Sequence, residues 1–199
     1  MTSSLPIRQV TFERTTRETS IQVELNLDGS GQGDVETGLG FFDHMLGAWA
    51  RHARVDLRLR CRGDLHIDDH HTIEDCGLAL GTAIDRTLGE RTGILRFGSA
   101  NAPLDESLVR AVVDLSGRGG AWVELPFRGR QLGAVATENL VHFFRSLAST
   151  LRGTLHVDAI RHENDHHLAE AAFKATALAL RQAWQRDGSA EVPSTKGVL

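Results

Sequence analysis

The sequence predicts an α+β protein made of two similar halves, each a sheet with helices packed on one face. Two observations support this prediction. The pattern HHxxE occurs at 70–74 and again at 166–170, inside a wider similarity between the two parts of the chain. In each part, segments in which apolar and polar residues alternate occur beside segments with helical spacing. Self-similarity of this kind is typical of duplicated folds, so we expect the element order β-β-α-β-α to occur twice.

Shorter similarities extend the repeat beyond the histidine pairs. His44 in FFDHMLGAW matches His142 in LVHFFRSLA, GDLHID at 63–68 matches GTLHVD at 153–158, and VEL at 23–25 matches VEL at 123–125. The sequence separation between matched residues of the two halves varies by a few residues, as insertions in loops would cause. The largest change comes from the six-residue segment AIRHEN at 159–164. We expect one domain over residues 1–199, with repeats near 8–98 and 99–190 and a C-terminal tail at 191–199.

The elements of the first half follow from two spacings of apolar residues, the alternation typical of a strand and the spacing of about 3.6 residues typical of a helix. IQVELNL at 21–27 alternates apolar and polar residues, which predicts a strand with one buried face. Residues 39–52 and 70–88 are predicted to be helices, and the second of these starts at the first HH pair. VDLRLRC at 55–61 predicts the strand between them.

The second half repeats this order. LVRAVVDL at 108–115 and AWVELPF at 121–127 predict two strands, which the turn-forming segment SGRGG separates. Helices are predicted at 137–152 and at 165–186, and TLHVDAI at 154–160 predicts the strand between them.

Composition excludes several classes of function. The net charge is −4, with 24% charged and 41% apolar residues, which is typical of a globular protein without a basic surface for nucleic acid. No apolar run approaches the length of a membrane span, and the first residues, MTSSLPIRQV, contain no hydrophobic signal segment. Cys61 and Cys76 form no CxxC motif and are too few for a disulfide framework. We expect a cytoplasmic protein that binds neither nucleic acid nor membrane.

The histidine content is unusual, at 10 residues. Residues three and four apart share one face of a helix, so His71 and Glu74 can hold one ion between them, and His167 and Glu170 repeat that relation. The histidine that precedes each of these points about 100° away on the helix, which suits a second ion.

We therefore predict two cation sites, each with three imidazoles and one carboxylate. One site takes His44, His71, Glu74 and, from the other half, His166; the other takes His142, His167, Glu170 and His70. A single histidine is more often a core or surface residue, and we assign structural roles to the rest: His52, His66, His156 and His162. Imidazole and carboxylate ligands suit several metals, including zinc, iron and manganese, so ligand type alone does not name the metal.

Other polar residues suit an anionic substrate. Lys174 follows Glu170 by four residues and lies on the metal-facing side of the helix. A positively charged lysine is unfavourable beside metal cations unless an anion lies between them, so its position indicates an anionic substrate. Four residues beside glycines or in turns suit a phosphate: Arg96, Arg118, Ser194 and Lys196. Taken singly, each is more often an ordinary surface residue. Glu18, Asp105 and Glu106 have no distinguishing pattern.

These motifs together resemble the imidazoleglycerol-phosphate dehydratase family, over about residues 7–198. The segments that carry the resemblance are RETSIQVELNLDGSG, TGLGFFDHML, GDLHIDDHHTIEDCGLALG, RFGSANAPLDES, DLSGRG, HHLAEAAFKA and PSTKGVL. The chain departs from the family at His162, because the second HH motif usually starts with glycine there.

The resemblance implies a hydro-lyase that removes water from D-erythro-imidazole glycerol phosphate to give imidazole acetol phosphate, a step of histidine biosynthesis. It implies two Mn²⁺ ions per active site, a fold like a duplicated second domain of ribosomal protein S5, and a homo-oligomer of 24 subunits with active sites between subunits. Glu18 falls on the family's acid/base glutamate, which also binds substrate. Five residues fall on its phosphate-binding positions: Arg96, Arg118, Lys174, Ser194 and Lys196.

We therefore expect dehydration through a metal-stabilised imidazolate, with a catalytic set of Glu18, His71, Glu74, His167 and Glu170. Two rival functions use the same residue types. A dinuclear metallohydrolase would need further aspartates at metal-ligand spacing, which the sequence lacks. A histidine-rich metal-binding or assembly protein would bind metal tightly but would need no acid/base glutamate.

Overall fold

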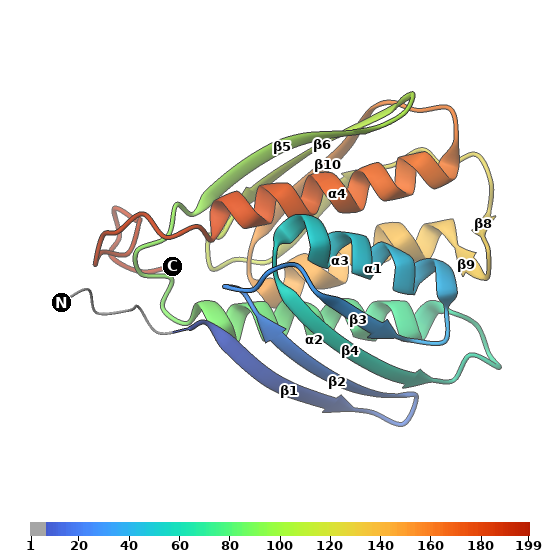
Figure 1. Cartoon of the computed structure of the whole chain (residues 1–199), viewed down its shortest axis with the longest axis horizontal. Coiled ribbons are helices and arrows are strands. Elements are labelled where there is room, and N and C mark those ends of the chain that lie inside the picture. The colour runs from blue at the N-terminus through green and yellow to red at the C-terminus, as the bar shows by residue number, and fades with distance from the viewer. Residues whose placement is uncertain (1–6) are drawn as a thin grey trace.

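The computed structural model describes residues 7–199 and shows two four-stranded sheets with four helices between them (Figure 1). The strand order is β1-β2-β4-β3 in one sheet and β5-β6-β10-β7 in the other. These orders are equivalent between the halves, so the duplication and the α+β class are confirmed. Each sheet turns one face to the helices, as expected.

The first half consists of β1 (Gln9–Thr15), β2 (Thr19–Asn26), β3 (Gly33–Glu36), α1 (Gly40–Ala53), β4 (Asp56–Gly63) and α2 (His70–Leu88). The second half consists of β5 (Phe97–Leu104), β6 (Ser107–Asp114), β7 (Gly120–Glu124), β8 (Gln131–Leu132), β9 (Val135–Ala136), α3 (Thr137–Leu151), β10 (Thr154–Arg161) and α4 (Asp165–Ala183). The hairpin β8–β9 has no counterpart among the described residues of the first half.

Apart from the hairpin β8–β9, each half as described contains one strand more than the expected order before its first helix. The strand β5 was missed because its sequence, FGSANAPL, contains glycine, asparagine and proline, which are depleted in strands. It lies at the edge of the sheet, where proline is tolerated, and it pairs with β6 along its whole length. Pairing with a neighbouring strand therefore overrides the weak local preference.

Two of the short similarities do not mark equivalent positions in the halves. VEL at 23–25 lies in β2, whereas VEL at 123–125 lies in and just after β7, the counterpart of β3. GDLHID at 63–68 starts at the last residue of β4, whereas GTLHVD at 153–158 begins β10, the counterpart of β4. These two equivalences were wrong, because matches of so few residues also arise by chance.

The first helices of the two halves end in the same way, which confirms that His44 and His142 are equivalent. Arg54 follows α1 in a left-handed conformation, with φ of 57°, and its N–H donates to the Ala50 carbonyl. Arg152 follows α3 with φ of 56° and donates to the Ala148 carbonyl. Such a left-handed residue satisfies a carbonyl that the helix end leaves free.

The helices pair across the two halves, and this pairing positions the functional residues. Helix α1 packs on α4, and α2 packs on α3. The second contact is very close, because a Cβ atom at Gly77 would lie 2.9 Å from the Phe143 carbonyl oxygen, and one at Gly81 would lie 2.9 Å from the Leu151 nitrogen. All four helices begin at the same end of the molecule (Figure 1).

Aromatic side chains join the halves into one continuous core. Phe143 of α3 packs edge-on against Phe42 of α1, with ring centroids 5.3 Å apart, and stacks on Phe173 of α4 at 5.2 Å. All three are completely buried. Burial of a side chain of this size stabilises a fold by about 1.5–3 kcal/mol. Among residues 7–199, no helix combines the length and the apolarity that crossing a membrane requires.

Candidate active site

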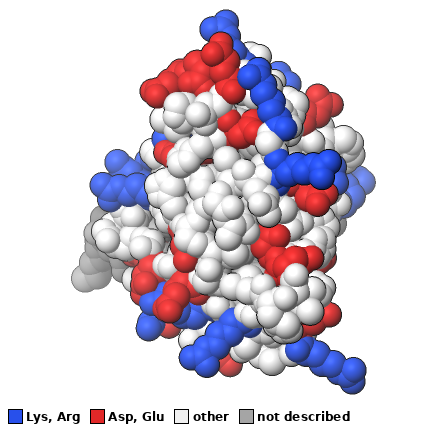
Figure 2. Space-filling view, turned by 90° about the vertical axis from the view of Figure 1, so that its right-hand side faces the viewer, with Lys and Arg blue, Asp and Glu red and all other residues white. Residues whose placement is uncertain are grey.

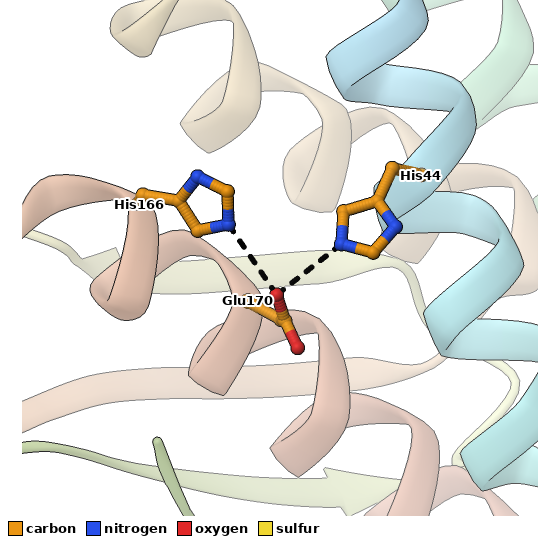
Figure 3. Close-up of side chains that lie close together, drawn as sticks. All are labelled: His44, His166 and Glu170. Carbon is orange, nitrogen blue, oxygen red and sulfur yellow. Dashed lines mark hydrogen bonds and ion pairs between the residues drawn. The ribbon is translucent and has the colours of Figure 1, made fainter. Parts of the chain in front are cut away.

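One cluster of metal-ligand type lies between α1 and α4 (Figure 3). We call it the α4 triad; it consists of His44, His166 and Glu170. The Nε2 atom of His44 lies 3.3 Å from Glu170 Oε2, and the Nε2 atom of His166 lies 3.5 Å from the same oxygen. Asn164 precedes α4, and its side chain accepts the backbone N–H groups of both histidines in the HH pair, which fixes the first turn of the helix.

A second cluster lies between α2 and α3. We call it the α2 triad; it consists of His70, Glu74 and His142. Glu74 Oε2 lies 3.3 Å from His70 Nε2, and Glu74 Oε1 lies 3.4 Å from His142 Nε2. The His70 and His142 rings are stacked, with centroids 5.0 Å apart. His142 Nε2 is buried and has no hydrogen-bond partner among the described residues. A buried lone pair beside a carboxylate fits a cation.

The expected grouping of the ligands was therefore wrong in two respects. Each triad uses the first histidine of its HH pair, four residues before the glutamate, instead of the second histidine three residues before it. His44 also lies with Glu170, not with Glu74 of its own half. The reason is the pairing of helices across the halves, which a helical period within one half cannot predict.

The second histidine of each pair faces away from the triads toward other carboxylates. His71 Nδ1 lies 3.0 Å from Asp64, and its Nε2 lies 3.8 Å from Glu18. His167 Nδ1 lies 2.8 Å from Glu106. The hydrogen bond to Asp64 raises the pKa of His71. The bond between His167 and Glu106 raises the pKa of the histidine and lowers the pKa of Glu106 to about 2.

Glu106 was overlooked in the sequence although a signal for it exists. Glu18 is the residue immediately before β2, and Glu106 is the residue immediately before β6. These strands are equivalent, so an alignment of the halves through them pairs the two glutamates. Asp64 and Asn139 carry no comparable signal, because their contacts with the histidines depend on how the loops and helices pack.

Lys174 lies where its spacing predicts, one helical turn after Glu170. Its Nζ atom is 2.6 Å from Glu170 Oε1, and only 17% of its side chain is exposed. Burial raises the pKa of Glu170, but the hydrogen bond and the charge of Lys174 outweigh this effect and leave the pKa below its usual value. The α2 triad contains no such ion pair with a lysine among the described residues.

The other expected phosphate-binding residues lie far from both triads. Arg96 binds Asp114, with Nε 2.7 Å from Oδ1, and donates to the Pro193 carbonyl near the C-terminal tail. Its backbone N–H donates to the carbonyl of Ala183, the last residue of α4. A helix of 19 residues is about 28 Å long, so one chain does not bring Arg96 to a triad. Arg118 lies in the loop between β6 and β7, and Ser194 and Lys196 lie in the C-terminal tail that follows α4 (Figure 1).

The end of the molecule where the helices begin is not dominated by one sign of charge. Figure 2 shows that residues other than Lys, Arg, Asp and Glu, drawn white, occupy the centre of this face, with separate acidic and basic groups around them. The candidate ligands therefore lie on a face of mixed charge, which does not resemble the basic surface of a nucleic-acid-binding protein.

Comparison with known proteins identifies the family. The family model described as Imidazoleglycerol-phosphate dehydratase matches residues 37–180. Proteins of that name are 52% identical in Phaffia rhodozyma, over the full length of both chains, and 55% identical in Phytophthora nicotianae, where the chain spans 43% of the relative. The crystal structure of IGPD from Pyrococcus furiosus in complex with (S)-C348 matches with a TM-score of 0.83 and 40% identity, over 94% of this chain and 100% of that one. The Staphylococcus aureus dehydratase matches with a TM-score of 0.81 and 32% identity, over 89% and 99%. The chain therefore belongs to the imidazoleglycerol-phosphate dehydratase family and is a hydro-lyase of histidine biosynthesis.

Proposed function

We propose that the chain catalyses the metal-dependent dehydration of D-erythro-imidazole glycerol phosphate to imidazole acetol phosphate and water. The observation that supports this most directly is the pair of two-histidine, one-glutamate triads at the end where the helices begin. Each triad offers imidazole and carboxylate atoms within 4.8 Å of one another, which is the spacing that ligands of one cation require.

The residues fit two Mn²⁺ ions per active site. The α4 triad and the α2 triad would each supply three ligands, and His71 and His167 would supply a fourth ligand to each ion. The buried Nε2 of His142, which has no hydrogen-bond partner among the described residues, supports this assignment. When bound, the ions supply Lewis acidity toward the imidazole ring of the substrate.

The fourth ligands and the phosphate-binding residues indicate that each active site lies between subunits. His71 and His167 turn away from the triads of their own chain. Arg96 lies at the opposite end of α4 from Glu170. Neighbouring copies of the chain can bring these groups together, and we propose a homo-oligomer of 24 subunits, located in the cytoplasm.

Side chains of this protein would carry the proton and bind the phosphate. Glu18 has 52% of its side chain exposed and lies beside His71, so its carboxylate is free to take a proton from the substrate carbon and to return one at the departing hydroxyl. Five residues would bind the phosphate: Arg96, Arg118, Lys174, Ser194 and Lys196. Lys174 can exchange its contact with Glu170 for the anion when the carboxylate binds a cation.

The deciding experiment measures dehydration of imidazole glycerol phosphate by protein that is stripped with a chelator and then loaded with Mn²⁺. We expect loss of turnover on stripping and recovery on loading. Normal turnover by the stripped protein would exclude metal dependence. Absence of activity at any loading would favour a metallohydrolase or an assembly protein instead.

A substitution separates catalysis from assembly. Glu18→Gln is expected to bind metal and assemble normally but to lose dehydration, because an amide cannot accept the proton. Glu13→Gln is the matched control, since Glu13 is an exposed carboxylate on β1 that contacts Gln22. Full activity of Glu18→Gln would remove Glu18 from the mechanism.

A further inference from the structure

We propose that Asn139 is a positioning residue that fixes the tautomer and the orientation of His70 in the α2 triad. The proposal rests on the proposed function only in that the α2 triad binds a cation. Asn139 lies in the first turn of α3, three residues before His142, and only 6% of its surface is exposed.

A chain of hydrogen bonds runs from the backbone to His70. The Ala136 N–H donates to Asp69 Oδ2 over 2.8 Å, and Asn139 Nδ2 donates to Asp69 Oδ1 over 3.0 Å. On its other side, Asn139 Oδ1 lies 3.0 Å from His70 Nδ1. Asp69 is buried with 9% exposure, so its carboxylate depends on these donors.

The direction of these bonds determines which nitrogen of His70 carries the proton. A carboxylate only accepts hydrogen bonds, so Asp69 selects the amide nitrogen of Asn139. The amide oxygen then faces His70 and accepts the Nδ1 proton. This leaves the His70 Nε2 lone pair directed at Glu74, 3.3 Å away. Two acceptors at that distance repel each other unless a proton or a metal cation lies between them.

The equivalent position in the other half lacks this polar contact. Phe41 precedes His44 by three residues, and its ring packs edge-on against His166, with centroids 5.2 Å apart. Asp165, which precedes that HH pair as Asp69 precedes the first, accepts backbone N–H groups of Arg128 and Gly129. The amide support is therefore specific to the α2 triad, and it gives a test with an internal control.

The test is calorimetric titration of chelated, metal-free protein with Mn²⁺. Loss of such a hydrogen bond typically weakens metal affinity by about 10- to 100-fold. We expect Asn139→Leu and the smaller Asn139→Ala to weaken one of the two bound Mn²⁺ ions by this factor and to leave the other unchanged. Phe41→Leu, the matched control, is expected to leave the affinity of the α2 triad unchanged. Circular dichroism verifies that each variant is folded.

A double-substitution cycle distinguishes positioning from a general structural effect. If Asn139 acts through His70, adding Asn139→Ala to His70→Ala causes no further loss of Mn²⁺ affinity. A further loss of tenfold or more would overturn the proposal, as would unchanged affinity in the single variants. Failure of the wild-type protein to bind Mn²⁺ would overturn the proposed function as well. If the wild type binds Mn²⁺ and the Asn139 variants bind it equally tightly, this inference alone would be overturned.

Discussion

Replacement of Gly81 by alanine tests how closely α2 and α3 must approach. A Cβ atom at this position would overlap the Thr150 hydroxyl and the Leu147 carbonyl oxygen and would lie 2.9 Å from the Leu151 nitrogen. Two of these atoms belong to the α3 backbone, which cannot rotate away. Overpacking of this kind costs about 1–3 kcal/mol, and the helical preference of alanine over glycine offsets about 1 kcal/mol. Because the overlap is with backbone atoms, we take the upper end of this range and expect a net loss of about 2 kcal/mol.

Gly47 provides the opposite case in the middle of α1. A Cβ atom there would meet no described atom within 4 Å apart from the surrounding turns of its own helix. Gly47→Ala should therefore show the helical preference alone and raise the free energy of unfolding by about 1 kcal/mol. The two variants make the same chemical change in the same kind of element, so the difference between them, about 3 kcal/mol, measures the close approach of the helices.

Urea unfolding of the metal-free proteins, followed by circular dichroism at one protein concentration, measures both changes. With a denaturant slope of about 2 kcal/mol per molar, the midpoint of Gly81→Ala should fall by about 1 M and that of Gly47→Ala should rise by about 0.5 M. A Gly81→Ala protein as stable as the wild type would refute the reasoning. It would mean that α3 moves aside at little cost.

Three further outcomes follow from buried or hydrogen-bonded groups. Burial raises the pKa of Asp56, but hydrogen bonds from the backbone N–H groups of 30–32 outweigh this effect and lower the pKa. The stability that Asp56 contributes is present above its unfolded pKa and is lost as the pH falls through its lower folded pKa. The difference in urea midpoint between wild type and Asp56→Asn should therefore shrink as the pH falls below about 4. Arg91 is 2% exposed and donates to two carbonyls at the end of α3 and to a carboxylate on α2. Arg91→Met should therefore lower the free energy of unfolding by about 3–5 kcal/mol, which thermal unfolding measures. Cys61 and Cys76 are buried, and burial raises the pKa of Cys76, so both thiols should react with Ellman's reagent only after unfolding.

The helices were predictable because their signals are local. The expected ranges 39–52 and 70–88 differ from α1 and α2 by no more than one residue at either end. The HH pairs were found because the repeat places them at equivalent helix starts. In contrast, β5 was missed because its edge position compensates for a sequence with poor strand preference.

The partners of the ligand histidines were less predictable than the histidines themselves. Whether Glu74 lies with His44 or with His142 depends on which helices touch, and that depends on the glycines of α2 and the aromatic core. The amide of Asn139 has no pattern at all in the sequence, because its importance arises only from two neighbours in the fold, Asp69 and His70.

A chain that contained only one half would lack a complete triad, since each triad takes its glutamate from one half and a histidine from the other. Two such half-length chains would complete both triads only as a symmetric homodimer with identical sites. Duplication and fusion of the gene make that pairing permanent and release the two sites from symmetry. The asparagine at 139 and the phenylalanine at 41 show the result, because a self-associating ancestor would have had to carry the same residue at both positions.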